Sequence, residues 1–370
     1  MWQRSVRHAE HGSSAGRDPR EVIIHDQLVR MRFSLPVNPT EVSPGGQLVG
    51  STASISHPST RTKLLTRRRL QVALGLFWLL DAGLQFQPYM FTKAFVTQVL
   101  SMNAMYQPDV IGNFIIALAR FLAPHAAAWN TVFAAIQLAI GIGLLWPRTV
   151  RLALSISFVW VLGVWAIGEG FGRLFTGTAT LAGGAPGAVL LYGVVGLLVW
   201  PKTSLGEQSM NVSVAGEGVM GERGGRILWT ILWFGGAIVQ LLPSPYPPIS
   251  VLVTTINMNL PEPGVLRHLD VITTTFVERA GLPFVLLLVT IEAFVGIYIW
   301  RGERWVRPVL WIGILLSVIY WVVGQNFGGI FAGNATDPNA GPLFVLLALT
   351  LYPRSPRIRA QNNPTMKEAT

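Results

Sequence analysis

Two carboxyl side chains lie inside long apolar stretches of this sequence and are the residues best placed to do chemistry. Asp81 lies midway along the apolar run 70–88, and Glu292 lies midway along the run 282–300. In a membrane-spanning helix, an ionised carboxylate at the bilayer centre costs at least ~2.5–3.5 kcal/mol. Such residues generally face a bundle interior and have a function. We therefore interpret both as candidate catalytic, proton-handling carboxyls; the alternative is a structural carboxyl hydrogen-bonded to a nearby glutamine.

A glycine-rich motif occurs twice in the chain. Residues 165–180 read WAIGEGFGRLFTGTAT, and residues 321–336 read WVVGQNFGGIFAGNAT, which is a separation of 156 residues (321 − 165). Four residues upstream also recur, each 155 residues later: Trp78, Ala82, Gln85 and Pro88. This period is far too long for a solenoid repeat and indicates a duplicated domain.

The composition is that of a membrane protein. Hydrophobic residues make up 51% of the 370 residues and charged residues only 12%, against roughly 25% charged in soluble domains. Several apolar runs reach the ~17–25 residues that a transmembrane helix needs. The absence of cysteine excludes disulfides, thiolate metal sites and iron–sulfur ligation.

The apolar runs predict an all-α fold with eight transmembrane helices. Four lie in the first copy, near 70–88, 127–146, 150–168 and 184–200, and four in the second, near 226–243, 282–300, 306–324 and 340–352. Because four is an even number, the copies have the same orientation and form two parallel four-helix repeats. The predicted organisation is a disordered tail (1–60), the first repeat (61–201), a cytoplasmic linker (202–225), the second repeat (226–354) and a C-terminal tail (355–370).

The basic residues are distributed unequally between the two sides of the predicted bundle. Counting from residue 61, 17 Lys and Arg fall on the side of the termini, and five fall on the other side. Positive residues are retained on the cytoplasmic side. We therefore expect a multi-pass protein of the cell membrane with both termini cytoplasmic. The net charge of +10 reflects this topology, and we expect no nucleic-acid partner.

The loops on the opposite side hold the remaining candidate binding residues. Segments 89–126 and 244–281 have apolar residues at helical spacing and predict helices lying at the membrane interface. The glycine-rich stretches 168–187 and 324–342 each precede a short apolar run, which in transporters marks a binding site formed by re-entrant backbone; alternatively, the glycines allow tight loops. The candidate binding residues are Trp165, Glu169, Arg173, Trp321, Gln325, Asn326 and Arg120.

Some of these polar residues also have simpler interpretations. Glu169 would pair with Arg173, four residues on, if the helix continued. The oxygen-rich cluster between Asn334 and Asn339, with Asp337 inside it, could coordinate a hard cation. An Asp-Pro-Asn sequence is, however, more typical of a turn, and we predict no metal site.

The two copies have diverged at the intramembrane carboxyls. Asp81 corresponds to Gly236, and Glu292 corresponds to Gln137. Only one member of each pair keeps a carboxyl, which favours a single centre shared by both copies over two equivalent sites.

Each copy resembles the DoxX/DoxD-like group of small four-span membrane proteins. In the first copy the resemblance lies in Leu74-Gly75-Leu76-Phe77 and in Ile136-Gln137 with Gly141; in the second it lies in Ile291-Glu292 with Gly296, followed by Arg307. The group usually has one four-span unit, whereas this chain would hold two in tandem. The resemblance implies a quinone-linked or other redox process, since some members act with thiosulfate:quinone oxidoreductases.

The leading hypothesis is a DoxX-like integral membrane protein that supports such a redox process at the outer face. A quinone is the cofactor this hypothesis allows, and the expected partners are the lipid bilayer and a quinone or partner subunit. One alternative is a transporter or channel with its site at the glycine-rich re-entrant segments. Another is a non-catalytic scaffold for a partner subunit. The sequence leaves open whether the protein is an enzyme.

Overall fold

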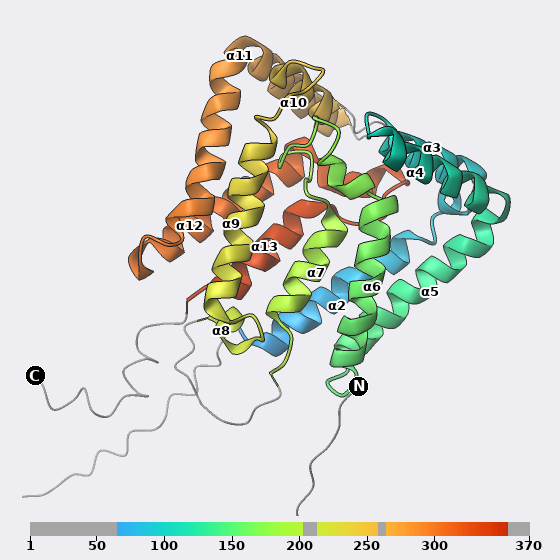
Figure 1. Cartoon of the computed structure of the whole chain (residues 1–370), viewed down its shortest axis with the longest axis horizontal. Helices are drawn as coiled ribbons and strands as arrows, with labels where there is room; N and C mark the ends of the chain where they lie inside the picture. Colours follow the sequence, from blue (N-terminus) through green and yellow to red (C-terminus); the bar gives the residue numbers. More distant parts are fainter. Residues whose placement is uncertain (1–64, 203–212, 258–263, 354–370) are drawn as a thin grey trace, which may run out of the picture. The chain divides into compact units, whose positions relative to one another are not determined.

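The predicted all-α fold is confirmed. A computed structural model describes residues 65–202, 213–257 and 264–353, and every regular element in these ranges is helical (Figure 1). The tails 1–60 and 355–370 and residues 203–212 of the predicted linker lie outside the described residues. We call residues 65–202 the first half and residues 213–353 the second half.

Each apolar run of the sequence contains a helix. In the first half these are α2 (Arg67–Leu84), α5 (Ala126–Leu145), α6 (Val150–Ile167) and α7 (Ala188–Leu198). In the second half they are α9 (Gly221–Val239), α11 (Gly264–Tyr298), α12 (Glu303–Ile319) and α13 (Ala340–Leu351). By length and composition, four helical stretches of the described chain could cross a membrane: Asp109–Leu145, Val150–Ile167, Gly264–Tyr298 and Glu303–Ala332.

The long helix α11 combines two predicted segments. Its backbone leaves the helical conformation at Gly281 (φ 64°, ψ −155°), and Pro283 follows. Proline removes a backbone donor and its ring clashes with the preceding turn, so this is where a helix bends. The bend separates the predicted interfacial segment from the apolar run that carries Glu292.

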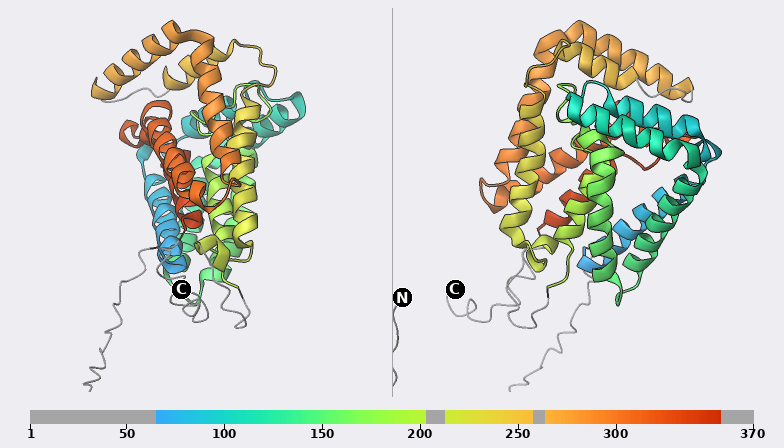
Figure 2. Two further views of the ribbon diagram at one scale, coloured as in Figure 1. Left: turned by 90° about the vertical axis from the view of Figure 1, so that its left-hand side faces the viewer. Right: turned by 45° about the vertical axis from the view of Figure 1, so that its right-hand side comes forward.

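Short helices cover one end of both halves. The first half contributes α3 (Lys93–Ala104) and α4 (Asp109–Leu122), and the second contributes α10 (Pro248–Asn257) with the start of α11. Figure 2 shows both pairs at the same end, lying across the helices below. A small apolar cluster that includes Ile115 and Leu122 holds α3 and α4 together.

The halves meet along α7 and α13, which pack against each other. Nearly every residue of α7 is buried, as is most of α13. Glycine allows close contact elsewhere: a Cβ at Gly296 of α11 would lie 2.6 Å from the backbone nitrogen of Phe234 in α9. Small residues at helix crossings let backbones approach in this way in membrane bundles.

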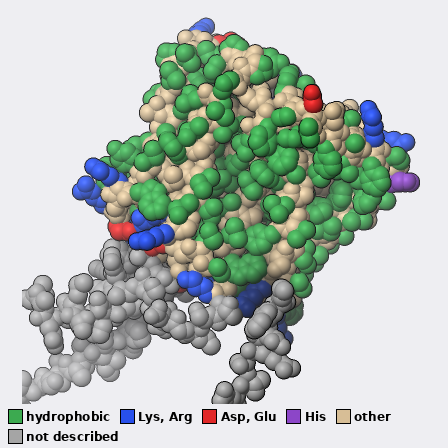
Figure 3. Space-filling model, in the orientation of Figure 1, with side chains coloured by type: hydrophobic (Ala, Val, Ile, Leu, Met, Phe, Trp, Pro, Cys, Tyr) green, Lys and Arg blue, Asp and Glu red, His purple; other side chains and the backbone are tan. Residues whose placement is uncertain are grey.

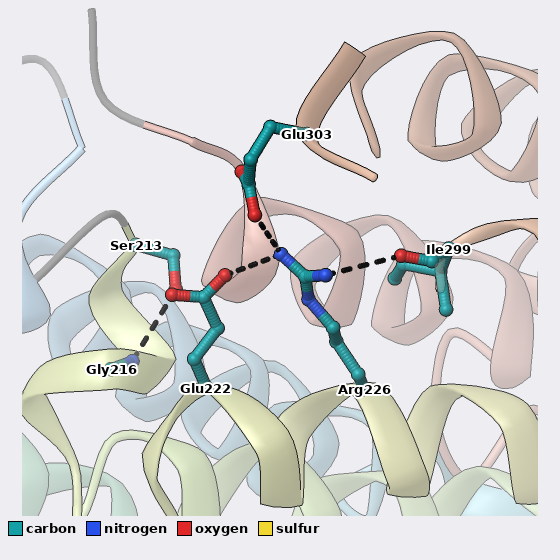
Figure 4. Close-up of polar contacts among 6 residues, drawn as sticks. All are labelled: Ser213, Gly216, Glu222, Arg226, Ile299 and Glu303. Atoms are coloured by element: carbon teal, nitrogen blue, oxygen red, sulfur yellow. Dashed lines mark hydrogen bonds and ion pairs between the residues drawn. The ribbon is translucent and has the colours of Figure 1, made fainter. Parts of the chain in front are cut away.

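At the end of the second half away from α10, an arginine joins three elements. Arg226 of α9 forms ion pairs with Glu222 and Glu303, each at 2.6 Å, and donates to the Ile299 carbonyl at 3.3 Å (Figure 4). These partners lie on α9, at the start of α12 and just beyond α11. A partly buried arginine with several acceptors therefore ties three elements of the second half together.

Large apolar side chains point outward from the bundle. Leu152, Val159 and Leu162 of α6 and Ile231 of α9 are all exposed. Figure 3 shows apolar side chains covering much of one face, with Lys and Arg toward its edges. An exposed apolar surface this extensive is stable when lipid covers it, which agrees with a membrane protein.

Candidate functional site

The two glycine-rich stretches fold in the same way. We call residues 168–187 the first segment and residues 324–339 the second segment. The indole nitrogen of Trp165 donates to the carbonyl of Pro186 at 2.7 Å, and that of Trp321 donates to the carbonyl of Pro338 at 2.7 Å. Each tryptophan therefore fastens the far end of its segment to the helix that precedes it.

Both segments turn sharply directly after this helix. Phe171 and Gly172 have φ values of 56° and 59°, and Phe327 and Gly328 have φ values of 54° and 72°. This left-handed region strongly favours glycine. Space is restricted too, because a Cβ at Gly172 would overlap the Pro186 carbonyl oxygen, and one at Gly328 would lie 2.6 Å from the Pro338 carbonyl carbon.

Glu169 and Gln325 accept hydrogen bonds from the first turns of α7 and α13. Glu169 Oε1 accepts from the Val189 backbone N–H at 2.9 Å, and Gln325 Oε1 accepts from the Gly341 N–H at 2.9 Å. The first amide groups of a helix lack internal partners, and a carboxylate there also meets the positive end of the helix dipole. The expected i,i+4 pairing of Glu169 with Arg173 required α6 to continue through both residues. The helix instead ends at Ile167, and the chain then turns.

Each segment enters the other half. In the first segment, the Leu181 side chain packs so closely on Gly236 of α9 that a Cβ there would lie 2.7 Å from its Cδ2. The adjacent Ala182 carbonyl accepts from Gln325 Nε2 at 3.4 Å. In the second segment, the Ala335 carbonyl accepts from Gln87, beyond α2, at 3.0 Å.

Acidic side chains occur on α2 and on both segments. Asp81 of α2 is 3% exposed. Tyr192 of α7 is 2% exposed, and its ring packs on Trp78 of α2 at a centroid distance of 4.5 Å. Among the described residues, Asp81 Oδ1, Glu169 Oε2 and the Tyr192 hydroxyl are buried and have no hydrogen-bond partner.

Glu169 and Asp337 lie in connections outside the helices, and their environment disfavours ionisation. Burial raises the pKa of the Glu169 carboxyl, and the nearby charge of Asp337 raises it further. Burial likewise raises the pKa of Asp337, against the opposing effect of hydrogen bonds from Thr336 and the Asn339 amide.

Asp337 belongs to a turn that starts α13. The Thr336 hydroxyl donates to Asp337 Oδ2 at 2.8 Å, and the Asn339 amide donates to Oδ1 at 2.7 Å. Asn339 in turn accepts from the Ala340 amide. This is the turn interpretation of the Asp-Pro-Asn sequence. Across the described ranges, no three His, Cys, Asp or Glu residues lie close enough to hold a metal ion.

Glu292 has a different environment. It is 0% exposed, and its carboxylate accepts from the Tyr320 hydroxyl at 2.7 Å and from Gln240 Nε2. Both oxygens are thus bonded, and these bonds join α11 to the ends of α9 and α12. The alternative to a catalytic role, from the sequence, is a carboxyl hydrogen-bonded to a nearby glutamine. Glu292 has this hydrogen bond, to Gln240.

The remaining candidates occupy varied positions. Asn326 is buried at the turn of the second segment, and Arg173 is partly buried near Tyr106. Arg120 is exposed on α4. Tyr192 and the hydrogen bonds that Asp337 accepts within its turn were not predicted from the sequence. The repeat alignment held the signal for Asp337, because it replaces Leu181 at the same offset of 156 (337 − 181).

Comparison of the chain with protein-family models, with curated proteins and with solved structures finds no match. The function must therefore be argued from the geometry.

Substitution of Glu169 tests its role at the start of α7. Glu169→Gln should unfold at or above the temperature of the unchanged protein, because Gln325 makes the same bond in the second half. Glu169→Ala should cost about 1 kcal/mol, the usual loss for a missing N-terminal cap. Thermal unfolding in detergent measures both variants. Equal unfolding temperatures for Glu169→Ala and the unchanged protein would contradict the assignment.

Proposed function

We propose that this chain is a membrane carrier for a small solute, with its site where the two glycine-rich segments meet. In this proposal the eight helices α2, α5, α6, α7, α9, α11, α12 and α13 span the cell membrane as two parallel four-helix repeats. Both termini are cytoplasmic, and the short helices α3, α4 and α10 lie on the outer side.

The observation that carries the proposal is that each glycine-rich segment packs against the other half. Non-helical backbone at membrane depth is stable only when it is buried in protein or lines a wet cavity. Here it is buried against the other half, through Leu181 on Gly236 and Gln87 on Ala335. Carriers built from repeats place their site at such broken helices between the halves, and rocking of one half against the other then exposes it to each side in turn.

The proposal is tested by uptake into proteoliposomes. The probes are radiolabelled thiosulfate, choline and glycerol, which represent an anion, a cation and a neutral solute. We expect the unchanged protein to take up one of them faster than protein-free liposomes do. Gly172→Val should reduce this uptake at least tenfold, because its side chain would displace Pro186 and with it the start of α7.

Gly163→Val is the matched control, since a Cβ at this position of α6 meets nothing within 4 Å. It should retain the uptake of the unchanged protein. Uptake of all three probes no faster than by protein-free liposomes would contradict the carrier proposal.

A quinone-linked redox function is the second candidate, and a pair of aromatic clusters favours it. Trp165, Phe171 and Phe175 contact edge to face, with centroid distances of 5.2 and 5.6 Å. Trp321, Phe327 and Phe331 repeat the arrangement at 4.9 and 5.8 Å. Phe175 and Phe331 are 53% and 64% exposed, so a flat quinone ring could stack on either.

Thiosulfate-dependent reduction of a short-chain quinone by the purified protein distinguishes the candidates. The redox proposal, with Glu292 as the proton-handling group, predicts activity that Glu292→Gln abolishes. The carrier proposal predicts no reduction by either protein.

A further inference from the structure

Two connections, one from each half, pack on the first segment. We call residues 103–107, where α3 ends and the chain leads to α4, the first cover. We call residues 243–246, between α9 and α10, the second cover. Both belong to the end of the molecule that carries the short helices (Figure 2).

The first cover is hydrogen-bonded to the turn that begins the first segment. Gln107 Nε2 donates to the Gly170 carbonyl at 2.6 Å, and the Asn103 side-chain amide donates to the Gly168 carbonyl. A Cβ at Gly170 would lie 2.6 Å from the Asn103 carbonyl oxygen. The first cover therefore lies directly against this turn.

The second cover packs on the same segment a few residues further on. Gly177 has a φ of 71°, and a Cβ there would lie 2.9 Å from the Pro243 carbonyl oxygen and 3.1 Å from Ser244 Cα. Thr176, the residue before Gly177, is 4% exposed. The first segment thus passes from contact with one half to contact with the other.

A pair of tyrosines joins the two covers. The Tyr246 hydroxyl donates to the Tyr106 hydroxyl at 2.9 Å, and the rings meet edge to face with centroids 5.5 Å apart. The side chains are 41% and 46% exposed, so water competes for the same hydroxyl groups. A neutral hydrogen bond in this setting contributes little net stability. The contact can therefore break and form again readily.

The tyrosine pair is specific to one side of the duplicated chain. Phe91 stands at the position of Tyr246 (246 − 155 = 91), and Pro261 stands at that of Tyr106 (106 + 155 = 261). Neither side chain has a hydroxyl group, so these two residues cannot form the corresponding bond over the second segment.

We propose that the contact between Tyr106 and Tyr246 is the outer gate over the first segment, and that the gate is closed in this structure. The inference rests on the proposed carrier function. Because one tyrosine belongs to each half, a motion that parts the halves breaks their hydrogen bond. The same motion draws the second cover away from Gly177 and opens the adjacent stretch of the first segment to water.

The rate at which a buried cysteine reacts tests the gate without any transport assay. Thr176→Cys places the only thiol of the chain beside the second cover. A water-soluble maleimide should label it slowly in the full chain in detergent. Adding Tyr246→Phe, which removes the donated hydroxyl and keeps the ring, should raise the rate about fivefold, the effect of losing a typical neutral hydrogen bond on an opening equilibrium.

Tyr89→Phe is the matched control. The Tyr89 hydroxyl is also exposed and donates to Gln98, but both residues belong to the first half. It should leave the labelling rate unchanged. An unchanged rate with Tyr246→Phe, or an equal increase with Tyr89→Phe, would overturn the gate. Thr178→Cys replaces Thr176→Cys if that variant fails to fold.

Cross-linking separates the gate from the carrier proposal. Tyr106→Cys/Tyr246→Cys is joined by a short bis-methanethiosulfonate, and cleavage at a protease site inserted after Gln208 shows on a gel that the halves are linked. The cross-link should stop uptake of the probe solute into proteoliposomes, and a reductant should restore it. Uptake that continues through the cross-linked protein would leave the carrier standing and remove the gate. Faster labelling with Tyr246→Phe, without uptake of any probe, would keep the gate and contradict the carrier.

Discussion

Backbone that leaves the helix inside a membrane must find partners for its polar groups within the protein, and this requirement explains most of the structure. The two glycine-rich segments meet it with the same bonds. A tryptophan indole binds a proline carbonyl in each, and Glu169 or Gln325 accepts from the start of the next helix. Because each of these donors and acceptors belongs to its own half, each half carries the means to fold its own segment.

The requirement also binds the halves together. Leu181 packs on Gly236 of the other half, and Gln87 reaches the Ala335 carbonyl. In this arrangement neither segment can move without the partner half adjusting. These contacts make each segment part of the packing of the other half.

The two segments share their tryptophan–proline bonds and differ in the residues at Leu181 and Asp337. Where two copies keep the same residue, as at Trp165 and Trp321, the role is structural and is repeated. Where they differ, as at Asp81 and Gly236, one copy retains a packing contact and the other gains an ionisable group. A buried carboxyl is costly, and at this pair of positions only Asp81 carries one.

The sequence predicts the elements well because apolar runs and glycine–proline pairs act locally. The runs locate the helices, and Pro283 marks the bend in α11. The partners of the site residues could not be predicted in the same way. Glu169 suggests a pair with Arg173 only if α6 continues, and the positive φ angles that end it depend on tertiary packing. Leu181 meets Gly236 only because the first segment reaches the other half, which no local pattern encodes.

The crossing itself can be measured directly because the chain contains no cysteine. A Cβ at Gly183 in the first segment would lie 3.0 Å from Thr255 Cγ2 in α10 of the second half. The measurement is oxidation of the Gly183→Cys/Thr255→Cys variant in membranes, followed by cleavage at a protease site inserted after Gln208. The account predicts halves that stay joined on a denaturing gel until a reductant is added. Halves that separate without reductant, although both cysteines react with a maleimide, would contradict it.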